Sequence, residues 1–284
     1  MELEIIDKII TGVNNLPTLP TIYTAIFEAM EEPNITSEKL AKIISTDQVT
    51  AFKLLKVANS PFYGFYGRID TISQAILYLG YNEVRNIVLA LSVINFFSRN
   101  KILLHFRPVD FWAHSIGVGI ATRMIGEAIG EKKLENYFLS GIFHDIGKLL
   151  FFELAHKDYT RVMEIIENNN IRIKEAEVQV FGIDHARVGQ ILAEKWKLPV
   201  SIQNVILYHH VGVMENKRDL LIASVHLGNI LARILELGYA GDNLIPEPNQ
   251  AIWEFMNIPA GTFASMKIPL KENFESTIRL MLVE

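Results

Sequence analysis

The stretch LSGIFHDIGKLLFF, residues 139–152, is apolar at most positions and yet contains a histidine, an aspartate and a lysine. Its pattern is that of a protein interior, whereas His144, Asp145 and Lys148 carry groups that water solvates well. Burying a charge without a partner costs several kcal/mol. These three side chains must therefore pair with partners, reach a cavity or bind a ligand.

Apolar residues on either side of this stretch recur mostly at helical spacing. In ITSEKLAKIISTD, residues 35–47, Thr36 is the expected N-cap, and apolar residues follow one turn apart. The next predicted helix, roughly VTAFKLLKVAN, is expected to end before Pro61. A further predicted helix, in TISQAILYLG, ends on Gly80, a residue suited to a helix C-terminus. Clean period-two alternation is hard to find, so we predict an all-α fold.

The composition of the chain limits which kind of protein it can be and which side chains can bind a metal ion in it. The chain has 284 residues, half of them hydrophobic, and no cysteine, so any metal must be held by nitrogen and oxygen ligands. The N-terminal MELEIIDK lacks the features of a signal peptide, and the strongest apolar run, residues 87–97, is interpreted as a buried helix. We therefore expect a soluble, cytoplasmic protein with no membrane partner.

A boundary between two lobes is expected near residues 99–109, where the short basic segment RNKILLHFRP ends with Pro108. The predicted lobes are residues 1–105, an N-terminal helical lobe, and residues 106–284, a second helical lobe with a C-terminal extension. Seven of the eight histidines lie in the second lobe. Any metal or acid–base chemistry is therefore predicted there.

The second lobe contains the residue types that bind a divalent ion of borderline softness. Imidazole together with carboxylate suits Fe, Mn, Co, Ni or Zn, and sites for phosphoryl chemistry often hold two such ions. Asp110 lies one helical turn before His114, on the same face. The spacing is weak evidence, because the histidines are widely separated. The candidate ligands are Asp110, His114, His144, Asp145, His185, His209 and His210.

Structural roles compete with metal binding at each of these positions. A single histidine on an apolar helix, such as His114, is commonly a hydrogen-bonded core residue. The pair His144 and Asp145 can equally bond to nearby backbone, and Lys148 can extend along the helix to reach water. Surface or packing roles are expected for the remaining histidines, His105, His156 and His226.

Taken together, the motifs resemble the HD superfamily, and the wider pattern closely resembles its HDOD family, the HD-related output domains of bacterial signalling. The resemblance covers roughly residues 15–212 and weakens over the last seventy or so residues. The matching stretches, in family order, are LPTLPTIYTAI (16–26), IISTDQVTAFKLLKVANSPFYG (43–64), ISQAILYLGYNEVRNIVLA (72–90), FWAHS, GIFHDIGKL, FGIDHARVG, WKLP (196–199) and YHH.

The resemblance implies an N-terminal helical bundle packed on an HD-like lobe, and it extends to the HD-GYP phosphodiesterases that cleave cyclic di-GMP. It implies metal ligands at His114, His185, the pair His144–Asp145 and the pair His209–His210. It also implies an additional carboxylate ligand at Asp110. By the same resemblance, Lys148 would face a substrate phosphate and Asp145 would bridge metal ions, so both would be catalytic if the chain is an enzyme.

Two departures weaken the enzymatic implication of this resemblance. Val211 stands where the HD-GYP motif has a glutamate, and the GYP signature is absent. Asn229 stands where the final metal-binding aspartate is expected, and a neutral amide oxygen should lower the affinity for a second ion. The pattern therefore favours a site that is only partly equipped for catalysis.

The leading functional hypothesis is a regulatory or output module that contacts another signalling protein and carries a partial metal site. Aromatic side chains in ANSPFYGFYG, residues 58–67, are contact candidates if exposed and core caps if not: Tyr63, Phe65 and Tyr66. The alternative is a metal-dependent phosphohydrolase that binds a phosphate-containing ligand or a cyclic dinucleotide. A net charge of -5 argues against a nucleic-acid partner.

Overall fold

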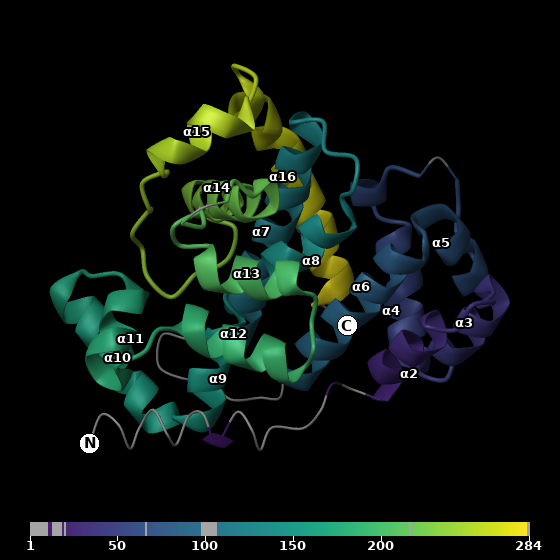
Figure 1. The fold of residues 1–284 in the computed structure, drawn as a ribbon, viewed down its shortest axis with the longest axis horizontal. Coiled ribbons are helices and arrows are strands. Elements are labelled where there is room, and N and C mark those ends of the chain that lie inside the picture. Colours follow the sequence, from purple (N-terminus) through teal and green to yellow (C-terminus); the bar gives the residue numbers. More distant parts are fainter. Residues whose placement is uncertain are drawn as a thin grey trace. The chain divides into compact units, whose positions relative to one another are not determined.

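The chain folds entirely into helices and loops in the part that the structure describes. The structure is a computed structural model, and it describes residues 11–12, 19, 21–65, 67–97, 107–215 and 217–282. Within these ranges there is no β-strand, and one isolated antiparallel bridge pairs Met214 with Lys217 (Figure 1). The prediction of an all-α fold is confirmed.

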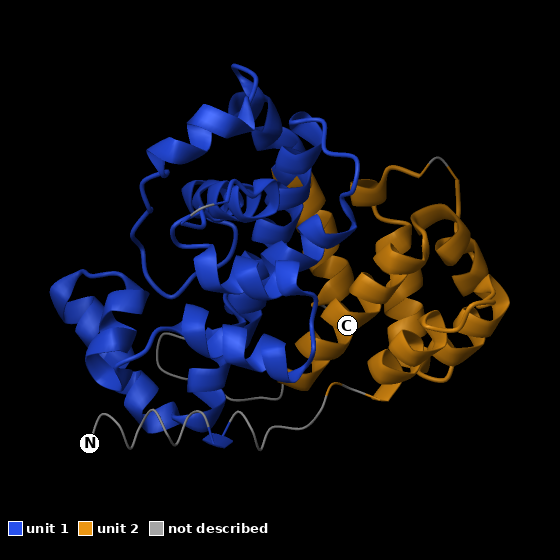
Figure 2. Ribbon diagram, in the orientation of Figure 1, with its two compact units in different colours: residues 1–16, 100–270 blue, residues 17–99, 271–284 orange. Residues whose placement is uncertain are grey.

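The chain divides into two compact units (Figure 2), and neither unit is a single continuous segment. Unit 1 comprises residues 1–16 and 100–270, and unit 2 comprises residues 17–99 and 271–284. The predicted lobes differ from this division at both ends of the chain: residues 1–16 were expected in the first lobe and fall in unit 1, and residues 271–284 were expected in the second lobe and fall in unit 2. The end of the last helix packs with unit 2, where Lys53 Nζ donates to the carbonyl of Met281 at 3.4 Å. The predicted boundary segment falls largely on residues 98–106, outside the described residues.

Unit 2 is a bundle of short helices whose ends follow local sequence rules. Thr36 accepts a hydrogen bond from the backbone N–H of Lys39 and caps the second helix, as predicted. Gly80, with a φ of +84°, ends the helix before the long buried helix α6, which contains the apolar run of residues 87–97. The helices are α2 (Thr21–Met30), α3 (Ser37–Ile44), α4 (Gln48–Ala58), the 3₁₀ turn η1 (Pro61–Tyr63), α5 (Ile72–Leu79) and α6 (Tyr81–Phe97).

Unit 1 contains all the candidate ligands. Its central helix α7 packs against α8 and α14, while α9 packs against α12 (Figure 1). Among the described helices, none has both the length and the apolar character that a membrane crossing requires. The helices are α7 (Pro108–Ala128), α8 (Glu135–Phe143), α9 (Ile146–Leu154), α10 (His156–Asn169), α11 (Ile173–Phe181), α12 (His185–Lys195), α13 (Val200–Tyr208), α14 (Leu220–Ile234), α15 (Gln250–Met256) and α16 (Thr262–Met281), whose last part belongs to unit 2.

Glycines allow the helices of unit 1 to approach closely where the candidate ligands lie. A Cβ at Gly141 would lie 2.5 Å from the Cα of Gly119, so α7 and α8 touch backbone to backbone. A Cβ at Gly147 would lie 1.9 Å from the carbonyl oxygen of His185. The space beside Gly147 is therefore filled by the backbone of α12, which places His185 next to the start of α9.

Replacing Gly147 by alanine is expected to destabilise the fold strongly. The backbone of α12 would have to move, and overpacking of this kind costs about 1–3 kcal/mol or more. Urea unfolding monitored by circular dichroism measures the change. Gly130→Ala is the control, because nothing lies within 4 Å of its Cβ and only its left-handed φ of +77° is costly. A Gly147→Ala variant as stable as Gly130→Ala would contradict the close contact.

Candidate metal centre

The pair His144–Asp145 lies at the junction between α8 and α9, deep inside unit 1. His144 is the C-terminal cap of α8, with φ of -51°, and Asp145 precedes α9 with φ of -104° and ψ of 10°. This break in the helix turns the two side chains toward each other, so that His144 Nε2 lies 3.2 Å from Asp145 Oδ2. Both residues are fully buried.

Two further histidines reach the same carboxylate from other helices. His185 is the first residue of α12, whose N-terminus is capped by Asp184, and His209 ends α13. Their Nε2 atoms lie 3.0 Å and 3.3 Å from Asp145 Oδ1, respectively. Asp145 is therefore surrounded by three buried imidazoles drawn from three segments of the chain.

The other ring nitrogen of each imidazole faces a hydrogen-bond acceptor. His144 Nδ1 lies 2.7 Å from the carbonyl of Gly141, and His209 Nδ1 lies 2.8 Å from the carbonyl of Ile206. His185 Nδ1 lies 2.5 Å from Glu177 Oε2. Because these oxygens only accept, each Nδ1 carries a proton, and a neutral ring then presents the Nε2 lone pair toward Asp145.

When the ring of His185 is neutral, this arrangement leaves a group of buried acceptors without donors. The atoms that lack a hydrogen-bond partner are His144 Nε2, His185 Nε2, His209 Nε2 and Asp145 Oδ1. Acceptors that converge at 3.0–3.3 Å repel one another unless a proton or a cation lies among them. The donor set, imidazole nitrogen with carboxylate oxygen, fits a divalent ion of borderline softness. These residues thus fit the metal that the sequence predicted.

Glu177 is a buried partner of the cluster that the sequence analysis missed. It is fully buried on α11 and accepts from both the ring and the backbone N–H of His185, the latter at 2.9 Å. Burial alone lowers the pKa of His185, but the carboxylates of Glu177 and Asp145 raise it to about 9. The burial of Glu177 could have been predicted from the sequence, because Glu177 falls in the apolar stripe of α11 with Ile173, Ala176 and Val180.

Lys148 does not reach solvent, so the interpretation that it extends to water is wrong. Its side chain is buried, its ammonium pairs with Asp145 Oδ2, and it also donates to the carbonyl of Ala240 at 2.8 Å. Burial alone raises the pKa of Asp145, but His144 and Lys148 hold that pKa well below its ordinary value. Asp145 is therefore ionised at neutral pH.

His114 and Asn229 form a second arm of the cluster. His114 Nε2 lies 3.1 Å from Asn229 Oδ1, and Arg233 Nε donates to the same oxygen at 3.3 Å. Burial lowers the pKa of His114 well below its ordinary value, and the nearby His144 and Arg233 add to the effect. The guanidinium of Arg233 therefore already supplies positive charge beside Asn229.

Among the described residues, the side chains that could hold a metal ion fall into two sets, and Asp110 belongs to neither. One set is His114, His144 and Asp145, and the other is His185, His209 and His210. Asp110 instead forms an ion pair with Arg107 at 3.0 Å, and its side chain is 38% exposed. The expectation that Asp110 is a ligand is therefore corrected: it shares a helix face with His114, but it lies in the first turn of α7, where it pairs locally.

The histidines that were expected to have surface or packing roles make contacts outside the group around Asp145. His226 donates from Nδ1 to the carbonyl of His209 at 2.8 Å and accepts at Nε2 from the backbone of Asn249 at 3.3 Å. His156 is exposed and packs against Phe152. Both roles agree with the prediction, whereas His105 lies outside the described residues.

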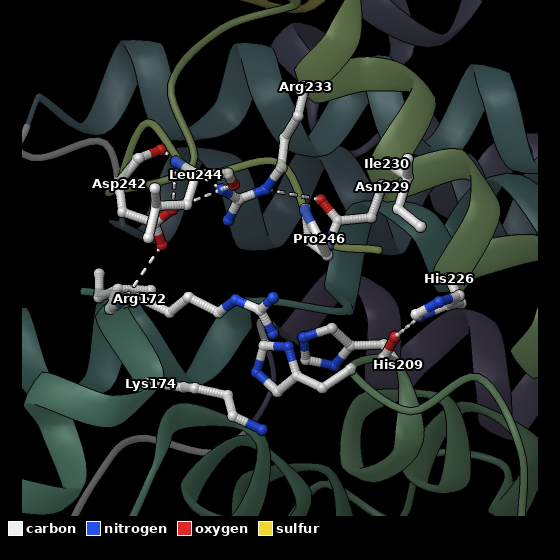
Figure 3. A pocket seen from close by; sticks show the side chains of 12 residues that line it. Arg172, Lys174, His209, His226, Asn229, Ile230, Arg233, Asp242, Leu244 and Pro246 are labelled. Atoms are coloured by element: carbon white, nitrogen blue, oxygen red, sulfur yellow. Dashed lines mark hydrogen bonds and ion pairs between the residues drawn. The ribbon is translucent and has the colours of Figure 1, made fainter. Parts of the chain in front are cut away.

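A narrow cavity borders the cluster on the side of His209 and His210. Figure 3 shows the side chains of Arg172 and Lys174 reaching toward His209, while Arg233 and Asp242 pair above it. Burial lowers the pKa of His209 to about 4, and it lowers that of His210 well below its ordinary value. Both rings are therefore neutral at pH 7 and able to bind a metal.

One family model matches most of the chain that contains these cluster residues. The HDOD domain model matches residues 16–211, which is well over half of the chain. The chain belongs to the HDOD family. The matched range includes every cluster residue except Asn229, which lies beyond its end.

Solved and curated relatives extend the comparison of this HDOD chain. An HDOD domain protein of unknown function from Geobacter sulfurreducens is similar over 99% of this chain and 98% of its own, with 26% identity and a TM-score of 0.83. A "Putative phosphohydrolase" from Shewanella amazonensis SB2B shares the fold at 20% identity, with 96% and 98% coverage and a TM-score of 0.76. An uncharacterized protein of Treponema pallidum is 24% identical over 79% of this chain, which spans only 43% of that relative.

Proposed function

We propose that this HDOD chain is a regulatory module of bacterial signal transduction that holds a single divalent metal ion in its buried histidine–aspartate cluster. The observation that carries the proposal is the set of buried Nε2 atoms around the Asp145 carboxylate, which are acceptors without donors once the ring of His185 is neutral. His144, Asp145, His185 and His209 would hold the ion, with His210 beside them. Such an ion would supply Lewis acidity or a fixed positive charge that orders the ends of α8, α12 and α13.

A single ion is proposed because the other half of the cluster, His114 and Asn229, already has the positive charge of Arg233 beside it. His114 bonds to the neutral amide of Asn229, and Arg233 bonds to the same oxygen. A second divalent ion there would displace that hydrogen bond and lie close to a guanidinium without gaining a carboxylate ligand. The charge repulsion and the missing ligand both weaken the binding of a second ion.

Elemental analysis of the purified protein tests the proposal. We expect about one transition-metal ion per chain after reconstitution, because preformed sites of this ligand type bind tightly. His144→Ala should lose most of this metal, whereas His156→Gln, which changes an exposed histidine outside the cluster, should keep it. Wild-type protein without metal, or a His144→Ala variant with full metal content, would contradict the proposal.

The second candidate function is hydrolysis of a phosphate ester by the same metal. It is favoured by Arg172 and Lys174, which line the cavity beside His209 and His210. Asp145 would orient the metal, and Lys148 would hold the carboxylate in its charged form. The name of the Shewanella relative agrees with this reading. Metal-dependent turnover of p-nitrophenyl phosphate, bis-p-nitrophenyl phosphate or cyclic di-GMP that His144→Ala abolishes would support hydrolysis, and no turnover would leave the regulatory role.

The partner proposed for the regulatory role is another signalling protein. The aromatic segment of residues 58–67 offers less exposed surface than the sequence alone allowed. Tyr63 donates to Glu83 Oε1 at 2.6 Å, and Phe65 is 37% exposed with its ring 4.2 Å from that of Tyr78. Tyr66 lies outside the described residues. Phe65 is therefore the residue of this segment that remains a contact candidate.

A further inference from the structure

Unit 2 has an open groove on its surface that shares no residue with the metal cluster. Helix α4, the loop that follows it and the last turns of α16 line this groove, so both segments of unit 2 contribute to it (Figure 2). Its volume is about 790 Å³, which is within the range of ligand-binding sites. The lining residues that decide its chemistry are Phe52, Leu55, Lys56, Ile69, Arg279 and Leu280.

Apolar side chains line much of the groove. Leu55 and Ile69 belong to a small hydrophobic cluster with Ala58 and Ala75, which fixes their positions. Phe52 is 59% exposed on α4, although its ring is large and apolar. An exposed aromatic ring beside a hydrophobic groove is typical of a surface that another molecule covers.

The apolar surface continues from the groove to Phe65, the contact candidate of the aromatic segment. Gly67 lines the groove, and a Cβ at Gly67 would lie 2.8 Å from the ring of Phe65. The centre of the Phe65 ring lies 4.2 Å from that of Tyr78, whose side chain is also exposed. A partner that occupies the groove would therefore reach this aromatic pair as well.

Positive charge exceeds negative charge around the groove. Its described lining includes three cations and one carboxylate, Asp70, which pairs with Arg68 at 2.7 Å. Lys56 and Arg279 form no ion pair with any residue that the structure describes. Lys56 Nζ instead lies 4.4 Å from the centre of the Phe52 ring. The groove therefore has two unpaired cations beside apolar surface, in a protein whose net charge is -5.

We propose that this groove docks an acidic segment of the partner protein, which places a large apolar side chain against Phe52 and its carboxylates beside Lys56 and Arg279. The proposal rests on the proposed regulatory role for the existence of a partner, and it specifies the chemistry of the segment that binds. Burial of the apolar side chain would supply most of the affinity. The complementary charges would select acidic segments and speed their association.

The distribution of charge and apolar surface favours a protein segment over a nucleic acid. A nucleic-acid surface neutralises several phosphates with a stripe or patch of cations. This groove has two unpaired cations, and apolar side chains occupy much of the surface between them. A segment that combines acidic and large apolar residues matches both features, whereas a phosphate backbone matches the charge alone.

Selection from a display library of random short peptides on the full chain tests the proposal. Peptides with Asp or Glu near Leu, Phe or Trp should be enriched, and their synthetic forms should bind the full chain in fluorescence anisotropy. Phe52→Ala should weaken this binding about tenfold, as the loss of an aromatic anchor commonly does. Lys56→Glu/Arg279→Glu should weaken it about tenfold or more at low salt, and the salt dependence of the affinity should largely disappear.

Each groove variant has a matched control outside the groove. Ile268→Ala removes an exposed apolar side chain from α16. Lys132→Glu/Lys133→Glu reverses two exposed cations in the loop between α7 and α8, so it changes the net charge by the same amount as the groove variant. Both controls should change peptide affinity less than about twofold, because screening weakens the effect of distant exposed charges. Circular dichroism checks that all variants are folded.

Several results would overturn the proposal. These are the selection of no binding peptide, selected peptides without an acidic preference, and equal losses of affinity in groove and control variants. Displacement of the peptide by duplex DNA or by phosphatidylserine vesicles, with the same need for Lys56 and Arg279, would assign the groove to a different class of partner.

Metal content, measured on the same preparations, distinguishes this proposal from the metal site. The groove belongs to unit 2 and the cluster to unit 1, so the two can fail separately. Bound metal without peptide binding would contradict the docking groove alone. Peptide binding that needs Phe52 and the two cations, in protein without metal, would contradict the metal site alone.

Discussion

Asp145→Asn is expected to lower the free energy of unfolding by about 3–5 kcal/mol, because it leaves the buried ammonium of Lys148 without its charged partner. In the wild-type protein that ammonium has the carboxylate and the carbonyl of Ala240 as partners. The amide of the variant keeps the volume of the side chain and loses its charge. Urea unfolding in the presence of a chelator measures the effect separately from any metal contribution.

Adding Lys148→Met to this variant should restore most of the lost stability. The double variant buries no charge at this position, and replacing a buried ion pair by an uncharged pair of similar volume is often neutral or stabilising. It should still bind no metal, because the carboxylate ligand is missing. The free energy of unfolding would thus recover without bound metal. This result would distinguish the stabilising effect of the ion pair from that of the metal site.

Glu127→Gln is the matched control for the change from carboxylate to amide. Glu127 pairs with Arg123 at 3.3 Å on the surface of α7, and its side chain is 51% exposed. Exposed pairs of this type contribute little, so the change should stay within about 0.5 kcal/mol. A similarly small effect of Asp145→Asn would show that the Lys148 charge is solvated or neutral, against the geometry described above.

Metal affinity is expected to rise about tenfold per pH unit below pH 9 and to level off above it. The pKa of His185 is raised to about 9, so at pH 7 its ring carries a proton on Nε2 that a metal must displace. The pKa of His209 is about 4, and that of Asp145 lies well below its ordinary value, so neither contributes a proton above pH 6. The slope therefore corresponds to one proton, and its sign favours binding at higher pH.

Calorimetry in two buffers with different ionisation enthalpies measures this proton directly. Metal binding should release about one proton per ion at pH 7.5 and almost none at pH 10.

In Glu177→Gln, the pKa of His185 should fall, so proton release at pH 7.5 should drop below about half a proton, and metal affinity at high pH should fall about 10–100-fold. Glu164→Gln, on the exposed face of α10, should leave both quantities unchanged. Metal affinity independent of pH between 6 and 9 would contradict the assigned role of His185.

The sequence allowed much of the site to be predicted because its polar residues interrupt apolar stripes. His114, His144, Asp145, His185 and His209 all stand at positions where helical spacing requires burial, and the structure brings them together. Their convergence could be expected from the family resemblance but not from spacing, because the contacts join segments far apart in the chain.

The errors have equally specific causes. Lys148 was expected to reach water because its partner, the carbonyl of Ala240, lies 92 residues away and has no signature in the sequence. Asp110 shares a helix face with His114, but helix periodicity does not tell which end of α7 the cluster occupies. Glu177 was overlooked although its register is that of a core residue, since an acid eight residues before His185 matches no local pattern.

Helix α16 runs from Thr262 to Met281 and changes unit near residue 270. Unit 2 is therefore assembled from two separate segments of the chain. The polypeptide connects its first segment to unit 1 at both ends, and it connects the second segment to unit 1 between residues 270 and 271. A protease that cut only between residues 97 and 107 would nick the chain without releasing either part under native conditions. Excising an autonomous second unit would require rejoining residues 271–282 to residues 17–99 through an artificial linker.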